Sequence, residues 1–308
     1  MIIIRTPLRI SIAGGGTDLP QWYKEHGSMF ISAAINKYIY ITLQKSSYNR
    51  SYNLRYSCIE DVQNIGDIKH DIIRETFRYH KVGAGIALTS HADIPSGTGL
   101  GSSGSFSIGL LHALFPRETP IFIANEASRI QVDILKYPIG AQDQLTAIFG
   151  GINSYKIEKG NWGYTSIMPI KMDYKLFLSK LVMFYTGVKR DANTILTSST
   201  IKGLEEIQNI AYRAKDALQG DFDAYGALLD EHWEHKKKRH PEMSNPEIDA
   251  LYALGKENGA LGGKLIGAGG GGFLLFYTNE RDRLIRAMPL LHQPFDFDFE
   301  GSKIIYND

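Results

Sequence analysis

A stretch rich in glycine and serine, IPSGTGLGSSGSF, covers residues 94–106 and holds four glycines and four serines. It follows a strand-like segment, GIALTSHAD (85–93), and runs into SFSIGLLHALF (105–115), whose apolar spacing is helical. Glycine loses more backbone freedom on folding than any other residue, so this composition at one strand-to-helix boundary carries an entropic cost. Three explanations compete: a plain connecting loop, a dinucleotide-binding motif, or a phosphate-binding loop of another kind.

The two best-known glycine motifs are only partly matched. Residues 99–104 read GLGSSG, which fits G-x-G-x-x-G, but this pattern alone is weak evidence. A dinucleotide site also needs an acidic residue at the end of the next strand, whereas the segment around Glu126 looks helical. A Walker A motif is excluded because no Lys-Ser or Lys-Thr pair follows the glycines. A phosphate loop at a helix N-terminus remains, with Ser102 and Ser103 adding hydroxyls for phosphate or metal.

Two further glycine clusters lie before and after this stretch. GGGTD (14–18) follows a strand-like segment over residues 2–13, and a turn capped by Asp18 would account for it. GAGGGG (267–272) separates two strand-like runs and contains four consecutive glycines. A simple hairpin needs only one or two glycines. The excess indicates that a ligand or another loop packs against this backbone.

An acidic loop, YPIGAQDQLTAIFGG (137–151), places Asp143 between two glutamines. The sequence looks helical from Leu145 onward, so Asp143 is suited to be a helix N-cap. An aspartate after such a loop is equally suited to be a catalytic base or the partner of a cation. The residues alone leave these roles open.

Apolar periodicity predicts the order of the secondary structure. Strands are expected over residues 2–13, 28–44, 85–93, 180–186, 262–277 (with a glycine turn) and 302–306. Helices are expected over residues 69–81, 105–115, 120–136, 191–219, 222–238, 246–258 and 280–288. A change of character near residue 170 predicts two domains, residues 1–170 and 171–308.

Composition narrows the class of protein. The 308 residues are 43% hydrophobic and 22% charged, with a formal net charge of +1, which gives no field favouring nucleic acid or an anionic membrane. The single cysteine, Cys58, excludes an internal disulfide framework and suits a reducing compartment. No run of 18 apolar residues predicts a membrane span, and the N-terminal segment reads as a strand rather than a signal peptide. We expect a cytoplasmic, soluble monomer or homodimer.

Taken together, the three glycine clusters resemble the three motifs of the GHMP kinase superfamily. PLRISIAGGGTD (7–18) is similar to the first motif, IPSGTGLGSSGSFSIGLL (94–111) to the second, and KLIGAGGGGFLLF (264–276) to the third. Their order and spacing fit over essentially the whole chain. The resemblance implies an α+β, two-domain GHMP kinase fold with an N-terminal half like ribosomal protein S5 domain 2 and a ferredoxin-like C-terminal half. The active site would lie between the halves.

Within the superfamily, four segments resemble the D-glycero-D-manno-heptose 7-phosphate kinases. These are AGGGTDLP (13–20), YPIGAQDQLTAIFGGIN (137–153), FYTGVKRDANTIL (184–196) and residues 244–277. That family transfers the ATP γ-phosphate to the anomeric (C1) hydroxyl of the sugar phosphate, for nucleotide-activated heptose synthesis. The alternatives are a 1-kinase for an unphosphorylated sugar such as fucose, or a catalytically silent sugar or nucleotide sensor on this fold. ATP, Mg²⁺ and a small sugar phosphate are the expected ligands, with no nucleic acid or membrane partner.

The resemblance also implies residue roles. Asp143 takes the position of the catalytic aspartate, and Arg9 is placed to pair with it and hold it ionised. Asp18 takes the position that binds sugar hydroxyls, with the neighbouring backbone leaving room for the sugar. The residues expected to bind ATP are Gly97, Gly99, Leu100, Gly101, Ser102, Ser103 and Gly104. The residues expected at the substrate are Gly14, Gly15, Gly16, Thr17, Asp18, Arg190, Lys237, Gly269, Gly270 and Gly271.

Two sites depart from the family pattern or go beyond it. Ser103 is the expected Mg²⁺ ligand, but Gln131 stands where related enzymes carry a glutamate. Either Asp133 or Glu126 substitutes for it, with Asp133 nearer the expected place, or the metal is held by phosphates and water. A substrate phosphate also needs cations away from ATP. The basic run at 236–239 and the pair at 189–190 are the candidates, although a helix C-terminus also favours cations without any ligand.

Overall fold

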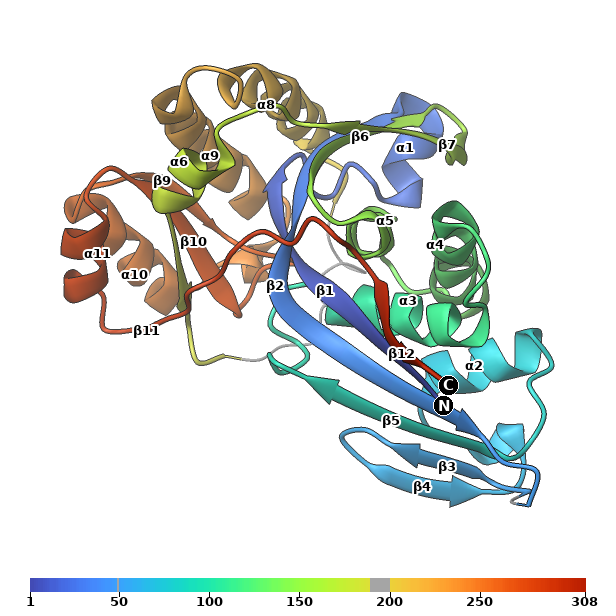
Figure 1. Ribbon diagram of the computed structural model, residues 1–308. Helices are drawn as coiled ribbons and strands as arrows, with labels where there is room; N and C mark the ends of the chain where they lie inside the picture. Colours follow the sequence, from blue (N-terminus) through green and yellow to red (C-terminus); the bar gives the residue numbers. More distant parts are fainter. Residues whose placement is uncertain (49, 189–199) are drawn as a thin grey trace.

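The computed structural model describes residues 1–48, 50–188 and 200–308. They form two sheets with helices packed against them (Figure 1). The larger sheet has eight strands: β1 (Ile2–Ala13), β2 (Ser28–Lys45), β3 (Tyr52–Arg55), β4 (Ile59–Val62), β5 (Ile86–Ala92), β6 (Ile152–Glu158), β7 (Asn161–Pro169) and β12 (Lys303–Asn307). The smaller sheet has four: β8 (Leu181–Tyr185), β9 (Ala260–Leu265), β10 (Phe273–Thr278) and β11 (Leu291–His292).

The long strand β2 is the centre of the larger sheet. It pairs with β1 along one edge, while its first residues pair with β6 and its last residues with β5 along the other. Its first eight residues are buried on both faces, which explains the near-continuous apolar run in the sequence. The C-terminal strand β12 pairs with β1, so the two chain ends lie side by side (Figure 1).

The helices divide between the two sheets. Around the larger sheet lie α1 (Pro20–His26), α2 (Asp71–Tyr79), α3 (Ser102–Leu114), α4 (Pro120–Ser128), the π-helix η2 (Arg129–Ile134) and α5 (Gln142–Phe149). The second half contributes α6 (Tyr174–Ser179), α8 (Leu204–Ala217), α9 (Phe222–Lys237), α10 (Pro246–Glu257) and α11 (Arg281–Ala287). Two short 3-10 turns, Ile65–Asp67 and Pro241–Met243, complete the described elements.

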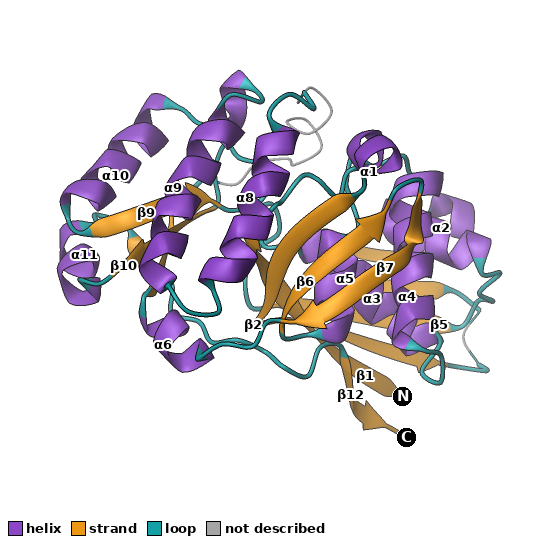
Figure 2. Ribbon diagram, turned by 90° about the horizontal axis from the view of Figure 1, so that it is seen from above, coloured by secondary structure: helices purple, strands orange, loops and turns teal. Residues whose placement is uncertain are grey.

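Each sheet carries its own helical layer. Helices α3 and α5 pack on β1 and β2, whereas α9 and α10 pack on β9, with α8 beside α9 (Figure 2). None of the described helices combines the length and apolar character needed to span a membrane.

Four predicted elements exist with nearly the expected bounds: those at 2–13, 85–93, 222–238 and 246–258.

Several expectations need correction. The helix predicted over 120–136 ends its regular α-helical part at Ser128 and continues as a π-helix to Ile134. Of the helix predicted over 191–219, the described part runs from Leu204 to Ala217. The strands β3, β4, β6 and β7 were missed. The division at residue 170 remains a prediction. Strand β12, from the second range, belongs to the larger sheet.

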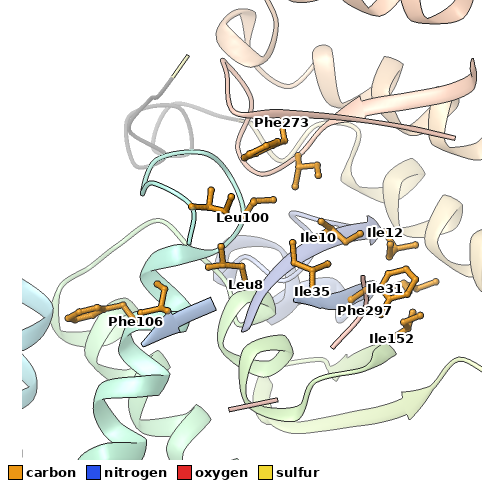
Figure 3. Close-up of a cluster of buried hydrophobic side chains, with 14 of the residues drawn as sticks. Leu8, Ile10, Ile12, Ile31, Ile35, Leu100, Phe106, Ile152, Phe273 and Phe297 are labelled. Atoms are coloured by element: carbon orange, nitrogen blue, oxygen red, sulfur yellow. The ribbon is translucent and has the colours of Figure 1, made fainter. Parts of the chain in front are cut away.

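The hydrophobic core continues from one sheet into the other. Leu100, in the glycine- and serine-rich loop, is 1% exposed. In Figure 3 it lies between Leu8 of β1 and Phe273 of β10, and all three belong to one buried cluster. The loop before α3 is thus fixed by apolar packing to both halves of the chain.

The third glycine cluster packs against this same loop. A Cβ added to Gly272 would lie 2.1 Å from the carbonyl oxygen of Thr98, and the residue has a φ of +98°. The sequence left two explanations for the excess of glycine, a ligand or another loop packed against the backbone. At Gly272 the structure shows another loop. Only glycine fits such a left-handed position with a backbone atom so close.

Comparing alanine substitutions at two glycines separates the cost of the close contact with Thr98 from the cost of a left-handed backbone conformation. We expect Gly272→Ala to lower the free energy of unfolding by about 2–4 kcal/mol, since overpacking adds to backbone strain. The matched control is Gly160→Ala, which has a φ of +82° but no described atom within 4 Å of the added Cβ. Urea denaturation of both variants measures the difference, and equal losses would contradict the packing argument.

Candidate active site

A cavity of about 470 Å³ is lined by both halves of the chain. This volume is typical of small-molecule sites. From the first half come Arg9 and Ser11 of β1, Gly15, Gly16 and Asp18 after β1, Ser96, Gly97 and Gly99 in the loop, Ser102 and Ser103 of α3, and Gln142 and Asp143 of α5. From the second half come His232, Lys236, Arg239, Lys264, Gly267 and Ala268.

Arg9 and Asp143 form an ion pair in the cavity wall. Arg9 Nε donates to Asp143 Oδ1 at 2.7 Å, and Arg9 Nη2 lies 2.6 Å from the same oxygen. The second oxygen, Oδ2, has no hydrogen-bond partner among the described residues. Asp143 lies in the first turn of α5, whose N-cap is Ala141. The N-cap role is therefore not what places Asp143; the ion pair is.

Arg9 also holds the glycine-rich loop. Its Nη1 donates to the carbonyl of Gly99 at 2.5 Å, and its backbone amide donates to the carbonyl of Leu100 at 3.0 Å. Arg9 is only 6% exposed, so these contacts form in a largely dry environment. One side chain thus connects β1, the loop before α3 and the start of α5.

The glycine-rich loop has the geometry of an anion site. Gly97, Gly99 and Gly101 have φ values of +78°, +85° and +77°, and α3 begins directly after them with no acidic residue in its first turn. Ser102 and Ser103 line the cavity at this helix end, where free amides favour anions. Gly97, Gly99 and Gly101 line it too, whereas Leu100 is packed in the core and Gly104 lies against Asp143.

Asp18 is fixed by two backbone amides. Gly16 donates to its Oδ1 at 3.1 Å, and Gln142 donates to its Oδ2 at 3.0 Å. Burial raises the pKa of this carboxyl and the charge of Asp143 adds to the rise, while the two amide bonds oppose them. A carboxylate oxygen accepts more than one hydrogen bond, so Asp18 retains capacity for a sugar hydroxyl.

The other residues of the first cluster divide between cavity and core. Gly15 and Gly16 line the cavity. Thr17 is fully buried and its Oγ1 donates to the carbonyl of Gly14 at 2.8 Å, so these two residues shape the turn. In the third cluster, Gly267 and Ala268 line the cavity, whereas the predicted Gly269, Gly270 and Gly271 pack against Met243 and Val188.

The cations of the second half differ from those expected. Lys237 pairs with Glu234 at 2.8 Å and is not among the cavity residues, and Arg190 lies outside the described residues. Lys236 and Arg239 line the cavity instead, 7% and 3% exposed. Burial lowers the pKa of Arg239 to about 10, so this group stays charged at neutral pH.

Lys264 and His232 complete this wall, and the sequence analysis missed both as ligand groups. Lys264 Nζ donates to the carbonyl of Ile12 at 3.0 Å and lies 3.3 Å from His232 Nδ1. Burial, together with the charge of nearby Arg9, lowers the pKa of Lys264 to about 7. A lysine within an apolar strand was the sequence feature that could have revealed this site.

The expected metal ligands do not come together. Ser103 lines the main cavity, whereas Asp133 lines a separate, smaller one beside Tyr23 and Ser128. Gln131 is fully buried and its Oε1 accepts from Gln144 at 2.7 Å, and Glu126 lies 3.4 Å from both His80 and Arg129. The described residues contain no group of three or more His, Cys, Asp or Glu able to hold a metal.

Family comparisons agree with this geometry. Residues 68–151 match the "GHMP kinases N terminal domain" and residues 214–290 match "GHMP kinases C terminal". A D-glycero-alpha-D-manno-heptose 7-phosphate kinase of Campylobacter jejuni is 30% identical, with 97% of each chain covered. The chain belongs to the GHMP kinase family. It is therefore a kinase, and ATP is the phosphoryl donor of this family.

Other relatives extend the comparison. A crystal structure of a D-glycero-D-manno-heptose 1-phosphate kinase from Bacteroides thetaiotaomicron has a TM-score of 0.80 at 23% identity, with 100% of each chain covered. An L-fucokinase/L-fucose-1-P guanylyltransferase of Bacteroides fragilis is 25% identical over 93% of this chain and 35% of its own length. The predicted α+β GHMP kinase fold, with N- and C-terminal parts, is confirmed.

The buried Lys264 makes the stability of this kinase depend on pH. Its pKa is about 7 in the folded protein and its ordinary value is 10.5. Between these values the unfolded chain binds the proton and the folded chain does not, so stability rises with pH in this window. We expect wild type to gain about 1–2 kcal/mol relative to Lys264→Met between pH 7.5 and pH 9.

Denaturant unfolding of the ligand-free protein across this range measures the effect. The Lys264→Met variant is the matched reference, because it replaces the amine with an unbranched apolar side chain of similar size and keeps every other titrating group. Parallel pH curves for the two proteins would contradict a buried lysine that loses its proton near neutral pH.

Proposed function

We propose that this kinase transfers the γ-phosphoryl group of ATP to the anomeric hydroxyl of D-glycero-D-manno-heptose 7-phosphate, giving the 1,7-bisphosphate. The reaction type is supported by one observation: the Arg9–Asp143 ion pair lies in the same cavity as the glycine-rich loop. The sugar phosphate is supported by the relative from C. jejuni, which matches along 97% of both chains.

The chemistry requires a proton acceptor for the sugar hydroxyl. As the anomeric oxygen bonds to the γ-phosphorus and the bond to the bridging oxygen of ADP breaks, the hydroxyl proton must leave. Asp143 Oδ2 would take it, since Oδ1 is occupied by Arg9. Arg9 orients this carboxylate and stabilises its ionised form. Asp18, anchored by two amides, would orient a second hydroxyl of the sugar.

The loop before α3 would hold the triphosphate. Its glycines give backbone access, and the N-terminus of α3 presents amides at Ser102 and Ser103 without a competing carboxylate in the first turn. Mg²⁺, when bound, would neutralise charge on the β- and γ-phosphates. Ser103, which lines the cavity, would supply a protein hydroxyl to it. A site with few protein carboxylates fits a metal held mostly by phosphate and water.

Removing the base tests the reaction directly. We expect Asp143→Asn to lower kcat by about 10²–10⁴ while ATP still binds, because the amide keeps the shape but cannot accept the proton. Asp282→Asn is the matched control, since Asp282 also lies in the first turn of a helix, α11, but is exposed. Steady-state kinetics and equilibrium binding of a non-hydrolysable ATP analogue measure both. Near-normal turnover by Asp143→Asn would refute the base assignment.

The substrate is tested by product analysis. In a screen of sugars and sugar phosphates, we expect the highest kcat/KM with D-glycero-D-manno-heptose 7-phosphate, with ³¹P NMR showing a new phosphate on C1. The names of the two heptose kinase relatives differ in the position of the phosphate, so the NMR position decides between them. A preference for fucose or another unphosphorylated sugar would support the alternative of a fucose-type kinase. The absence of multiple turnover with any sugar would indicate a sensor.

A further inference from the structure

Three side chains form a row along α9 and its C-terminal extension. His232, Lys236 and Arg239 are spaced four and three residues apart, which places them on one face of the helix. All three line the cavity and are at most 7% exposed. The sequence contains this periodicity, but the same basic run also includes Lys237 and Lys238. Lys237 pairs with Glu234, and Lys238 is exposed. We call these three residues the α9 row.

Arg239 is the buried cation of the α9 row that has no ion pair within 4.0 Å among the described residues. Lys236 lies beside it, and its Nζ donates to the backbone carbonyls of Leu265 and Gly267 at 2.7 and 2.6 Å, which fixes its position. A buried cation such as Arg239 is costly unless an anion joins it.

Two donors of this wall have no hydrogen-bond partner among the described residues. These atoms are Nη2 of Arg239 and Nε2 of His232. We assign Lys264 Nζ as the donor in its contact with Nδ1 of His232, which places the His232 proton on Nε2. Buried donors in native proteins are nearly always paired. Both residues line the cavity, so a ligand is the partner that the structure offers.

Arg239 also lies next to the sugar side of the cavity. Its Nη1 is 2.6 Å from where a Cβ of Gly16 would stand, so the glycine admits the guanidinium beside the first cluster. The charge of Asp18 acts on Arg239 and opposes the lowering of its pKa, but the two do not form an ion pair within 4.0 Å. The glycine-rich loop and the N-terminus of α3, which suit ATP, belong to the opposite half of the chain.

We infer that the α9 row, together with Lys264, binds the phosphate group that the sugar substrate already carries. The guanidinium of Arg239 and the Nε2–H of His232 would donate to phosphate oxygens, and the bound anion would favour the charged form of the neighbouring Lys264. This inference rests on the proposed function in one respect, that the acceptor is a sugar phosphate. It adds which residues make the kinase prefer a phosphorylated sugar to an unphosphorylated one.

The test compares the same sugar with and without its phosphate. For wild type, we expect kcat/KM with D-glycero-D-manno-heptose 7-phosphate to exceed that with D-glycero-D-manno-heptose by at least about 100-fold, the loss expected when a charged partner is left unpaired. Arg239→Gln should reduce this ratio at least about tenfold, through KM for the sugar phosphate, with KM for ATP unchanged. Lys238→Gln, which removes an exposed charge one residue away, should keep the wild-type ratio.

The outcomes separate the two claims. If wild type phosphorylates the heptose 7-phosphate and Arg239→Gln keeps the wild-type ratio, the α9 row is refuted and the proposed function stands. If wild type instead uses another sugar phosphate and Arg239→Gln loses that preference, the row stands and the heptose assignment is refuted. A wild type that prefers unphosphorylated sugars refutes both. If Arg239→Gln raises KM for ATP alone, Arg239 contacts the nucleotide, and the proposed phosphate-binding role of the α9 row is refuted.

A second measurement needs no variant and covers the case in which Arg239→Gln fails to fold. Inorganic phosphate should inhibit wild type competitively against the sugar phosphate and not against ATP. Inhibition that is competitive against ATP alone would place the free anion at the glycine-rich loop, and the α9 row would then have no role in phosphate binding.

Discussion

The side chain of Arg9 is the interaction on which the site depends. It is buried in β1 and contacts the carboxylate of Asp143 and the carbonyl of Gly99, while its own amide bonds Leu100. Gly99 lies 90 residues from Arg9 along the chain, and Asp143 lies 134 residues away. None of their relative positions therefore follows from local structure. A buried charge without its partner is strongly destabilising, which makes this arrangement all-or-none. The glycine-rich loop and Asp143 are therefore fixed relative to each other.

The second half of the chain contributes mainly basic side chains to the cavity wall. Its buried cations face the half that holds both Asp18 and Asp143, so the cavity has an acidic side suited to hydroxyls and a basic side suited to phosphate. Such a division matches a substrate that presents hydroxyls at one end and a phosphate at the other. Leu100 packs in one buried cluster with Leu8 and Phe273, so the two sides also share a part of the hydrophobic core.

Sequence patterns predicted the parts of the site that depend on local chemistry. The loop before α3, the turn after β1 and the position of Asp143 follow from glycine, serine and aspartate at element boundaries. The pairing of Arg9 with Asp143 came from the family resemblance, because it joins residues 134 apart. The patterns pointed to the basic run 236–239 but not to the members of it that line the cavity, because Lys236 and Lys237 differ only in which face of α9 they occupy. The short strands β3 and β4 were missed because their four residues each carry little periodicity.

A double-mutant cycle tests the central claim that Arg9 and Asp143 act as one catalytic unit. The measurement is kcat/KM for wild type, Arg9→Gln, Asp143→Asn and the double variant, with the same ATP and sugar phosphate. If Arg9 works through Asp143, the double variant will be about as slow as the slower single variant, because the second change removes nothing further. Losses that multiply in the double variant would show that the two residues act independently, and would contradict this account.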